Sequence, residues 1–399
     1  MPNFLQQQWV GRLRIKSLQV LGVTQVSDSY PNIKYKLSAL QRLLGDRYSE
    51  YVVHLSKSAV SQGMFSALSS GSLALVWRIL IGHIRVFFFS MRNRAESVYV
   101  CYPGIFITSW LGLPFIRNRY PVVYLDAFIS LYDTVVVDRR MLQKGGMLAK
   151  ILYRLEKRGF EAATAVVVDT PENASYYSEL FEIPIDKFRA MPLCIPPLSA
   201  DTRKTVERTP GRVRCVFVGT LVPLQGIRTI VDAAALLEQE PDIEFVCIGD
   251  GQHAEYIGRY LATTSNPRLT WHRGHYPTDF IVQQIREADI CLGIFGDGPK
   301  AQRVLPYKIY YYLALGMPVV TAMTDTAIRT LAECQGLGVD RPFVLVPAGD
   351  AQSLANSIRE LRDNPDERTR TGASGAEYFQ RALSDSAIDQ SLKELIEPV

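Results

Sequence analysis

The sequence lacks the paired cysteines that would indicate a metal site or a disulfide framework. Three of its cysteines, at positions 215, 247 and 291, lie inside apolar, strand-like runs, and no two cysteines form a C-x-x-C motif. We therefore expect buried cysteines with no metal or disulfide role. The full set is Cys101, Cys194, Cys215, Cys247, Cys291 and Cys334.

The sequence also lacks an obvious membrane-spanning or secretory segment. No window contains about 18 consecutive uncharged apolar residues, the length that a spanning helix needs. Residues 1–16 contain neither the apolar stretch nor the small-residue cleavage site of a signal peptide. We expect a protein that resides in the cytoplasm.

Charge is distributed unevenly between the two halves of the chain. The 399 residues are 47% hydrophobic and 21% charged, which is typical of a globular protein, and their number favours two domains. Residues 1–200 carry 23 Lys and Arg against 14 Asp and Glu, a net charge of +9, whereas residues 201–399 carry 21 against 26, a net charge of −5. This asymmetry indicates an anionic partner for the first half.

Short apolar runs alternate with helical patterns in the second half. The predicted strands are residues 213–219, 243–251, 289–295 and 318–322, and the predicted helices are residues 227–240, 278–288 and 306–315. The strands are apolar without alternation, which is typical of a parallel sheet covered on both faces. This order predicts a Rossmann-type domain of the α/β class.

The first half repeats this alternation less regularly. Its predicted strands are residues 17–23, 51–56, 97–102, 120–126 and 164–170, and its predicted helices include residues 73–94 and 146–163. We therefore predict two Rossmann-like domains facing a cleft, with a ligand at the carboxyl ends of the strands. The predicted divisions are a first domain at 1–197, a proline-rich linker at 198–212, a second domain at 213–375, and a C-terminal helix at 376–399 that packs back on the first domain.

Three cations follow the third predicted strand of the second half. Lys300, Arg303 and Lys308 lie in a loop and at the start of a predicted helix that begins at Pro306 and ends before Gly316. The free N–H groups and the dipole of a helix N-terminus attract anions, so this arrangement predicts a diphosphate site. The alternative is a solvated surface loop with scattered charges.

A resemblance to a known family follows from the order of these segments. The succession FVGT, PLQGI, IVDAAALL, FVCIGDG, LTWHRGHY, ADICLGIFG and PYKIYYYLALGMPVVTA, within residues 217–322, resembles the C-terminal domain of glycosyltransferases with the GT-B fold. It is most similar to the retaining, family-4-like bacterial enzymes that build polysaccharides. The first half resembles the acceptor domain of that family more loosely, through its strand order and the segment VVYLDAFISLYDTVVVDR.

The resemblance implies that the second domain binds a nucleotide-sugar and the first domain an acceptor. Gly219 and Thr220 would end the first strand near the diphosphate, and Gly249 and Gly251 would let the backbone pass close to the nucleotide. His275 would lie near the base. The further donor-binding positions implied are Gln225, Gly226, Lys308 and Tyr311.

The chain departs from the family pattern at three positions. Family members often carry an arginine after the first glycine and a lysine before the next, where this chain has Thr220 and Gln225. The usual ribose-binding glutamate corresponds to Tyr311. We assign the missing positive charge to the three loop cations, and we take Lys300 and Arg303 as catalytic residues that stabilise the departing diphosphate.

The carboxylates of the sequence bear on two expectations, the need for a metal ion and the binding of the acceptor. No Asp-x-Asp motif is present, so we expect a metal-free reaction with no cofactor beyond the nucleotide-sugar co-substrate. In the family, retention of configuration is credited to a front-face reaction without an enzyme nucleophile. Asp126 and Asp133 are the first-half carboxylates best placed to orient an acceptor, and Asp126 is the third catalytic candidate. The alternative is that both are N-cap or turn residues.

The predicted helix at 73–94 combines apolar spacing with basic residues. Arg78, Arg85 and Arg92 accompany aromatic and aliphatic residues, which is typical of a helix lying on an anionic membrane surface. Acceptors of related enzymes are often lipid-linked sugars, so we expect a peripheral location on the inner face of the plasma membrane. The alternative is a core helix with a solvated basic edge.

These features predict a retaining glycosyltransferase, a hexosyltransferase in the first instance, that moves a sugar to a polysaccharide or lipid-linked acceptor, as exopolysaccharide biosynthesis requires. One alternative is a non-catalytic GT-B protein that binds nucleotide or glycan and scaffolds a polysaccharide synthase. A Rossmann oxidoreductase would need a third glycine, which the segment GDGQHAEY lacks. No nucleic-acid partner is expected, because no recognised binding motif is present.

Overall fold

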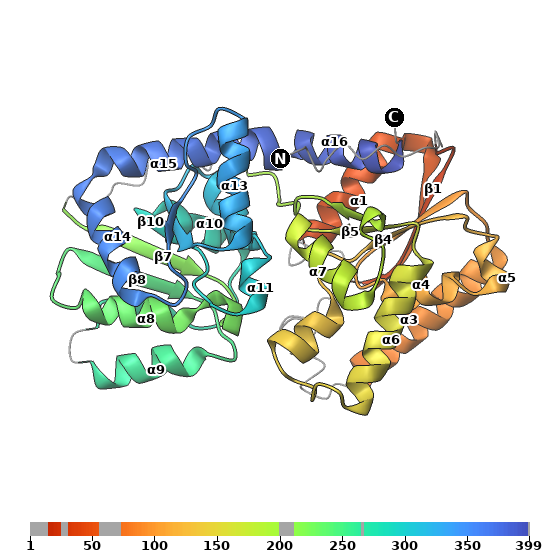
Figure 1. The fold of residues 1–399 in the computed structure, drawn as a ribbon, viewed down its shortest axis with the longest axis horizontal. Helices are drawn as coiled ribbons and strands as arrows, with labels where there is room; N and C mark the ends of the chain where they lie inside the picture. Colours follow the sequence, from red (N-terminus) through yellow and green to blue (C-terminus); the bar gives the residue numbers. More distant parts are fainter. Residues whose placement is uncertain (1–14, 25–30, 56–72, 199–210, 265–266, 398–399) are drawn as a thin grey trace. The chain divides into compact units, whose positions relative to one another are not determined.

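The structure, a computed structural model, describes residues 15–24, 31–55, 73–198, 211–264 and 267–397 (Figure 1). The chain divides into two compact units. Unit 1 contains Met1–Cys194 and Asp385–Val399, and unit 2 contains Ile195–Ser384. Most of the predicted linker at 198–212 lies outside the described residues. The chain leaves unit 2 after Ser384 and not at the predicted residue 375.

Unit 1 is built on a parallel six-stranded sheet with the order β2-β1-β3-β4-β5-β6. Its strands are β1 (Leu18–Thr24), β2 (Tyr48–His54), β3 (Ser97–Val100), β4 (Val122–Asp126), β5 (Ala165–Val168) and β6 (Phe188–Ala190). Strands β1, β3 and β5 are buried along their whole length. Their apolar sequences suit a sheet that helices cover on both faces.

Helices pack on both faces of this sheet. Their bounds are α1 (Pro31–Leu44), α3 (Leu73–Arg92), α4 (Ile105–Leu111), α5 (Pro114–Arg117), α6 (Met147–Ala162), α7 (Pro171–Phe181) and α16 (Asp385–Ile396), with short turns at η1 (Gly45–Arg47), η3 (Asp133–Asp138) and η4 (Ile185–Lys187). Helices α3, α4, α6 and α7 share one apolar core, which includes Val86, Leu111 and Phe160. Helices α1 and α16 share a second core, which includes Leu40 and Leu392. The last helix of the chain thus completes the unit that contains the first strand.

Unit 2 is built on a second parallel six-stranded sheet, with the order β12-β11-β10-β7-β8-β9. Its strands are β7 (Val213–Val218), β8 (Ile243–Ile248), β9 (Leu269–His272), β10 (Ile290–Leu292), β11 (Val319–Ala322) and β12 (Val344–Val346). Strands β10 and β11 are buried throughout. The sheet therefore has the same covered, parallel character as the sheet of unit 1.

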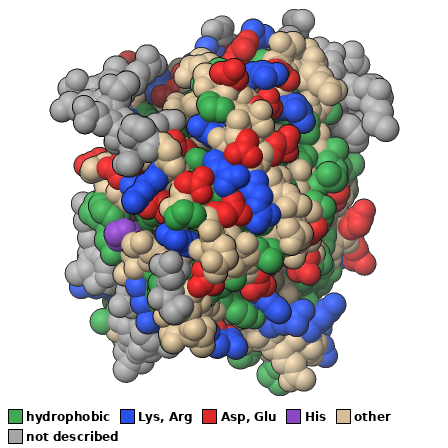
Figure 2. Space-filling model, turned by 90° about the vertical axis from the view of Figure 1, so that its left-hand side faces the viewer, with side chains coloured by type: hydrophobic (Ala, Val, Ile, Leu, Met, Phe, Trp, Pro, Cys, Tyr) green, Lys and Arg blue, Asp and Glu red, His purple; other side chains and the backbone are tan. Residues whose placement is uncertain are grey.

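The helices of unit 2 follow its strands in alternation. Their bounds are α8 (Ile227–Leu236), α9 (Ala254–Thr263), α10 (Thr278–Arg286), α11 (Pro299–Gln302), α12 (Tyr307–Ala314), α13 (Asp325–Gly336), α14 (Ala351–Asp363) and α15 (Pro365–Tyr378), with short turns at η6 (Pro223–Gln225) and η7 (Phe379–Leu383). Helices α8, α9 and α14 share one core. On the side of unit 2 where these helices lie, basic and acidic side chains are interspersed (Figure 2), as in the ion pair of Arg359 Nε with Glu240 Oε1 at 2.7 Å.

The predicted fold class is confirmed, because each unit is an α/β domain with a parallel, Rossmann-like sheet. Three strands, β6, β9 and β12, were not among the predicted strands. Each is short, and each lies at an edge of its sheet. All six cysteines are buried and free, as expected.

Each sheet contains a point at which the chain reverses the side on which it adds strands. In unit 2, β7 is followed by β8 on one side, whereas β10 lies on the other side of β7 and leads to β11. Strands β7 and β10 are neighbours, and the connections that follow them therefore run toward opposite edges of the sheet. Ligands of open α/β sheets bind at such a switch point, beyond the carboxyl ends of the strands.

Candidate functional site

The loops that follow β7 and β10 meet at the switch point of unit 2. The N–H of Phe295 donates to the carbonyl oxygen of Gln225 at 3.1 Å, and the N–H of Gly296 donates to that of Leu224 at 3.2 Å. Gly226 has a φ of 65°, and a Cβ there would lie 2.3 Å from the carbonyl carbon of Phe295. Only glycine combines this φ with so close an approach. The two loops are therefore held backbone against backbone.

Glycines also bring the loop after β8 against the loop after β7. A Cβ on Gly249 would lie 2.0 Å from the carbonyl oxygen of Gly219, and a Cβ on Gly251 would lie 2.8 Å from the nitrogen of Leu221. The N–H of Leu221 donates to the carbonyl oxygen of Asp250 at 3.0 Å. We predicted that Gly249 and Gly251 let the backbone pass close to the nucleotide, and that role stays a prediction. In this structure the two glycines let the loop after β8 pack closely against the loop after β7.

Lys308 extends from the first turn of α12 to the end of β7. Only 8% of this residue is exposed. Its Nζ donates to Oε1 of Gln225, and to the carbonyl oxygen of Gly293 at 3.1 Å. The Nζ also lies 3.5 Å from the centroid of the Phe217 ring. A Cβ on Gly219 would lie 3.2 Å from this Nζ, so the ammonium borders the backbone of Gly219.

The amino group of Lys308 is buried, and burial disfavours its charged form. Its contacts are an amide oxygen, a carbonyl oxygen and an aromatic ring, and no Asp or Glu within the described ranges forms an ion pair with it. Burial lowers the pKa of Lys308 well below its usual value, and the nearby Cys247 opposes that shift. A buried ammonium without a counter-ion is costly. An anion bound beside it would supply the missing charge.

The other two loop cations occupy different positions from those expected. We predicted that all three cations surround the N-terminus of one helix. A separate short helix, α11, instead begins at Pro299 and carries Lys300, which is half-buried. Arg303 follows that helix with 7% of the residue exposed, and its Nε donates to the carbonyl oxygen of Pro299 at 3.1 Å. Of the three cations, Lys308 is the one whose contacts place it at Gly219, and the roles of Lys300 and Arg303 stay predictions.

The remaining predicted donor residues differ in their exposure. Thr220 is exposed at the end of β7, and His275 is exposed in the loop after β9. Tyr311 is buried within α12, and its ring centroid lies 5.6 Å from that of Tyr307. Pro306, the predicted first residue of the helix, is the N-cap of α12, which begins one position later at Tyr307. These contacts neither establish nor exclude a donor role, which stays a prediction for each residue.

An aromatic cluster after β9 was missed in the sequence. The ring of His272 lies edge-on to Tyr276 and Phe280, with centroids 5.9 and 5.6 Å away, and Tyr276 stacks on Phe280 at 4.6 Å. The sequence singled out His275, three residues further on. The spacing of these residues carried no signal, because His272 ends a strand, Tyr276 lies in a loop and only Phe280 belongs to a helix.

Comparison with solved structures relates the whole chain to enzymes of known architecture. Anabaena HepE in complex with UDP is 13% identical, and the match covers 96% of this chain and 100% of that chain with a TM-score of 0.66. Sucrose-phosphate synthase from Thermosynechococcus elongatus is 15% identical, with 95% and 98% of the two chains covered and a TM-score of 0.67. Likeness at this identity establishes the fold, which is GT-B.

Comparison of the sequence with protein families matches one segment of the chain. Residues 212–364 match the family described as glycosyl transferases group 1. The chain carries a glycosyltransferase domain on a GT-B fold. No curated protein matches the sequence. The matched segment contains β7, β10 and Lys308, so the glycosyltransferase domain includes the switch-point site.

No group of three His, Cys, Asp or Glu side chains that could hold a metal ion occurs in the part of this glycosyltransferase that the structure describes. The feature that stands out at the switch point is the ammonium of Lys308, held between Gln225 and Gly293.

Asp126 was predicted to be available to an acceptor, and its position in unit 1 corrects that prediction. Only 1% of the residue is exposed. Its Oδ2 accepts hydrogen bonds from Nζ of Lys36 at 2.9 Å and from the hydroxyl of Tyr99 at 2.8 Å, whereas its Oδ1 has no hydrogen-bond partner among the described residues. The ion pair ties α1 to the end of β4. Asp133, in η3, is also buried.

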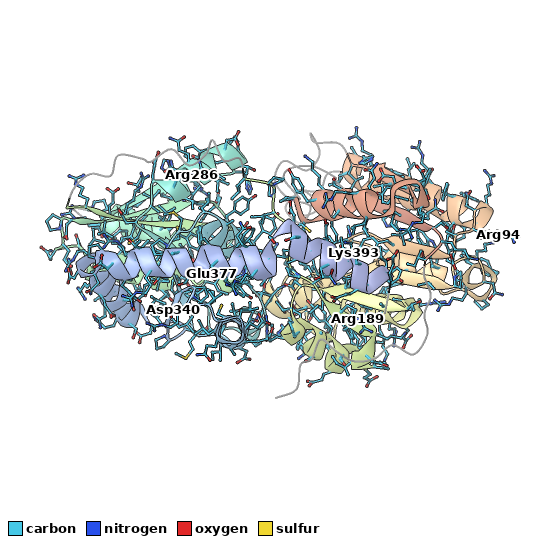
Figure 3. All side chains as sticks on the ribbon, turned by 90° about the horizontal axis from the view of Figure 1, so that it is seen from above. Arg94, Arg189, Arg286, Asp340, Glu377 and Lys393 are labelled. Carbon is cyan, nitrogen blue, oxygen red and sulfur yellow. The ribbon has the colours of Figure 1, made fainter. Side chains whose placement is uncertain are left out.

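Helix α3 presents an apolar and basic surface on unit 1, which we call the α3 face. Arg78, Arg85 and Arg92 are exposed, and Arg94, just beyond the helix, points outward (Figure 3). The exposed apolar side chains of this face are Val76, Trp77, Leu80, Ile81, Ile84 and Phe88, and 61% of Trp77 is exposed. A contiguous exposed apolar surface is typical of an interaction site.

The opposite side of α3 packs on the sheet. Val86 is fully buried, and a Cβ on Gly82 would lie 2.8 Å from a methyl group of Val23. The ring of Phe89 stacks on that of Tyr51 with centroids 4.0 Å apart. Within the described residues, Ala74–Arg92 is long and apolar enough to cross a membrane by length and composition, whereas we expected no such helix. Its sheet contacts make it a surface helix of unit 1.

The first turn of α6 presents further apolar side chains in unit 1. Met147, Leu148 and Ile151 are exposed, and 78% of Met147 is exposed. Lys150 and Arg154 are exposed on the same helix. Exposed apolar and basic side chains therefore occur together on α6, as they do on α3.

The buried ion pair in unit 1 allows a test of the role of Asp126. We expect Lys36→Met to lower the free energy of unfolding by about 3–5 kcal/mol, because the Asp126 carboxylate is left buried without its partner. The double variant Lys36→Met/Asp126→Leu should recover most of that loss. Denaturant unfolding followed by tryptophan fluorescence measures both effects. A double variant that is stable but has lost all glycosyl transfer would show that Asp126 acts in the reaction.

Proposed function

We propose that this protein is a retaining glycosyltransferase. It moves a sugar, in the first instance a hexose, from a nucleotide-sugar bound by unit 2 to a polysaccharide or lipid-linked acceptor. The observation that carries this proposal is the buried Lys308 at the switch point of a glycosyltransferase domain, with which no carboxylate of the described residues forms an ion pair. Structures of HepE contain UDP or UDP-glucose. Uridine nucleotides are therefore the first donors to test.

The site suits the departure of a nucleoside diphosphate from an anomeric carbon. Cleavage through an oxocarbenium-like state builds negative charge on the departing diphosphate. An ammonium that the protein already holds stabilises this charge without the reorganisation that water would need. Lys308 meets this condition, because Gln225 and Gly293 hold its Nζ before any donor binds. Attack by the acceptor on the face that the diphosphate leaves would retain the configuration without an enzyme nucleophile.

We further propose that the reaction needs no metal ion. A side-chain ammonium and backbone N–H groups can carry the charge that a divalent cation carries in other transferases. Lys308 supplies such an ammonium, and Lys300 on α11 is a second candidate.

We propose that unit 1 binds the cytoplasmic face of an anionic membrane through the α3 face. Its exposed apolar residues can enter the interface while Arg78, Arg85 and Arg92 contact anionic headgroups. The buried side of α3 stays on the sheet, which supports a helix lying in the interface over one that spans the bilayer. The exposed first turn of α6 adds apolar and basic side chains of the same kind.

A non-catalytic role is the second candidate. Thr220 and Gln225 stand where related enzymes carry an arginine and a lysine, so the donor site holds less charge than is usual for the family. A protein of this kind would bind nucleotide or glycan and scaffold a synthase. Hydrolysis or transfer of the donor sugar in the presence of membranes separates the two candidates.

The donor site is tested by the variant Lys308→Met. Thermal unfolding should be compared with and without UDP, GDP, ADP, dTDP and their sugars, since ligand binding to the native state raises the melting temperature. We expect one of these ligands to stabilise the unmodified protein. Lys308→Met should melt at the same or a higher temperature without ligand, because it removes a buried charge, and should reduce turnover by about 100- to 1000-fold. Full turnover by this variant would contradict the assignment.

The proposal of metal independence is tested by chelation. We expect EDTA to leave both donor binding and sugar transfer unchanged, because the charge on the diphosphate is met by side chains and backbone. The control is a known metal-dependent transferase in the same assay. Loss of transfer with EDTA, followed by recovery on addition of Mg²⁺ or Mn²⁺, would contradict this proposal.

Membrane attachment is tested with the triple variant Arg78→Glu/Arg85→Glu/Arg92→Glu. Each basic side chain near an anionic surface contributes about 1 kcal/mol. The affinity of the triple variant for anionic liposomes, measured by co-sedimentation, should therefore fall by several orders of magnitude. Binding by the unmodified protein should weaken as salt rises. The matched control, Arg228→Glu/Arg259→Glu/Arg341→Glu, makes the same change of charge at exposed positions of unit 2. We expect the control to bind nearly as well as the unmodified protein. Equal losses in both variants, or no loss in either, would contradict attachment through α3.

A further inference from the structure

Two side chains from different segments end at one point beside Gly219. Gln225 closes η6 in the loop after β7, and Lys308 lies in the first turn of α12. Nζ of Lys308 donates to Oε1 of Gln225. A Cβ on Gly219 would lie 3.2 Å from that Nζ and 3.4 Å from that Oε1. Both side-chain ends therefore border the same stretch of strand-end backbone.

The backbone of Gln225 is fixed on both sides, so the direction in which its side chain leaves the backbone is fixed as well. Its N–H donates to the carbonyl oxygen of Val222 at 3.0 Å, and its own carbonyl oxygen accepts from the N–H of Phe295 at 3.1 Å. The next residue, Gly226, takes a φ of 65° that other residues rarely adopt. A side chain at position 225 therefore leaves the backbone in the same direction in any variant that keeps this loop.

Among the residues that the structure describes, no carboxylate pairs with the Lys308 and Gln225 side chains. The groups around Nζ of Lys308 are the ring of Phe217, the carbonyl oxygen of Gly293 and the amide of Gln225. Cys247 on β8 is the titratable neighbour that acts on Lys308, and burial raises the pKa of this thiol to about 12, so it is neutral near pH 7. The pair as a whole therefore presents one ammonium and one amide oxygen.

We propose that Gln225 is the positioning residue for the ammonium of Lys308, and that the donor site requires one ammonium and one amide at this point, whichever of the two positions supplies each. This inference rests on the proposed donor site. Two lysines at the pair would repel each other, and two amides would leave the diphosphate without its cation. A lysine at 225 and a glutamine at 308 would reproduce the native set in exchanged order. The two positions should then be exchangeable together and not separately.

A glutamate at position 225 adds a negative charge, whereas a lysine there adds a positive one. Its carboxylate would form an internal ion pair with the Lys308 ammonium, and would compete with the diphosphate for it. Gln225→Glu should therefore favour the charged form of Lys308 while it weakens donor binding. A residue with a purely structural role would not couple these two effects.

The test compares five proteins: the unmodified chain, Gln225→Lys, Lys308→Gln, Gln225→Lys/Lys308→Gln and Gln225→Glu. Binding of UDP and of UDP-glucose is measured by calorimetry, with melting temperatures as a check on folding, and donor turnover is measured alongside. We expect Lys308→Gln to lose about 100-fold in affinity or turnover, in line with removal of one charge-stabilising group. Gln225→Lys should also lose affinity, because its two ammonium groups repel each other. The exchanged double variant should return to within about tenfold of the unmodified protein, which is a strongly non-additive result.

The pH dependence of binding provides a readout that a structural role would not change. In the unmodified protein, binding should take up a proton and weaken as the pH rises, because the pKa of the buried lysine is lowered and the diphosphate favours its charged form. In Gln225→Glu this weakening should move to higher pH, because the carboxylate stabilises the ammonium.

Two results would overturn the inference. One is a double variant no better than the worse single variant, although all variants melt near the temperature of the unmodified protein. The other is a Gln225→Glu variant that binds UDP as well as the unmodified protein does. In both cases, nucleotide binding by the unmodified protein shows separately whether the donor site exists. If it binds none of the nucleotides, the proposed function fails instead.

Discussion

The two backbone hydrogen bonds between the loops after β7 and β10 are the constraint on which the site of unit 2 depends. They join segments that diverge toward opposite edges of the sheet, and they fix the backbone of Gln225. With that backbone fixed, the amide of Gln225 can accept from Lys308, and the ammonium stays beside Gly219. Gly226 and Gly249 allow the loops to approach closely enough, so the glycines act through the protein's own packing. The chemistry of the site is thus a consequence of how neighbouring strand ends are joined.

Much of the fold could be predicted from the sequence, because buried parallel strands leave uninterrupted apolar runs. The central strands β1, β7 and β8 were found in this way. The edge strands β6, β9 and β12 were missed because segments of three or four residues carry too little periodic signal. Pairing with a neighbour defines them, and pairing is not visible in a single segment.

The site was less predictable, because burial and contacts between distant segments decide it. The sequence favoured Lys300 and Arg303 as catalytic residues and Lys308 as a donor-binding residue, since it gave only their common loop. The depth of Lys308 follows from the direction of α12. Asp126 looked accessible as a strand-ending aspartate, but Lys36 arrives from a helix 90 positions earlier in the chain and pairs with it. The apolar residues of α3 exceed what one helix face can bury, so periodicity could not separate its packed side from its exposed side.

The division of unit 1 between the two ends of the chain has a consequence for biosynthesis. Helix α16 contributes Ile388, Leu392 and Ile396 to the core that also contains β1 and α1. A ribosome makes β1 of this unit before it makes unit 2, and makes α16 after it. Unit 2, encoded without interruption between them, can complete its core first. The core that α16 shares with α1 and β1 therefore stays incomplete until α16 has left the ribosome.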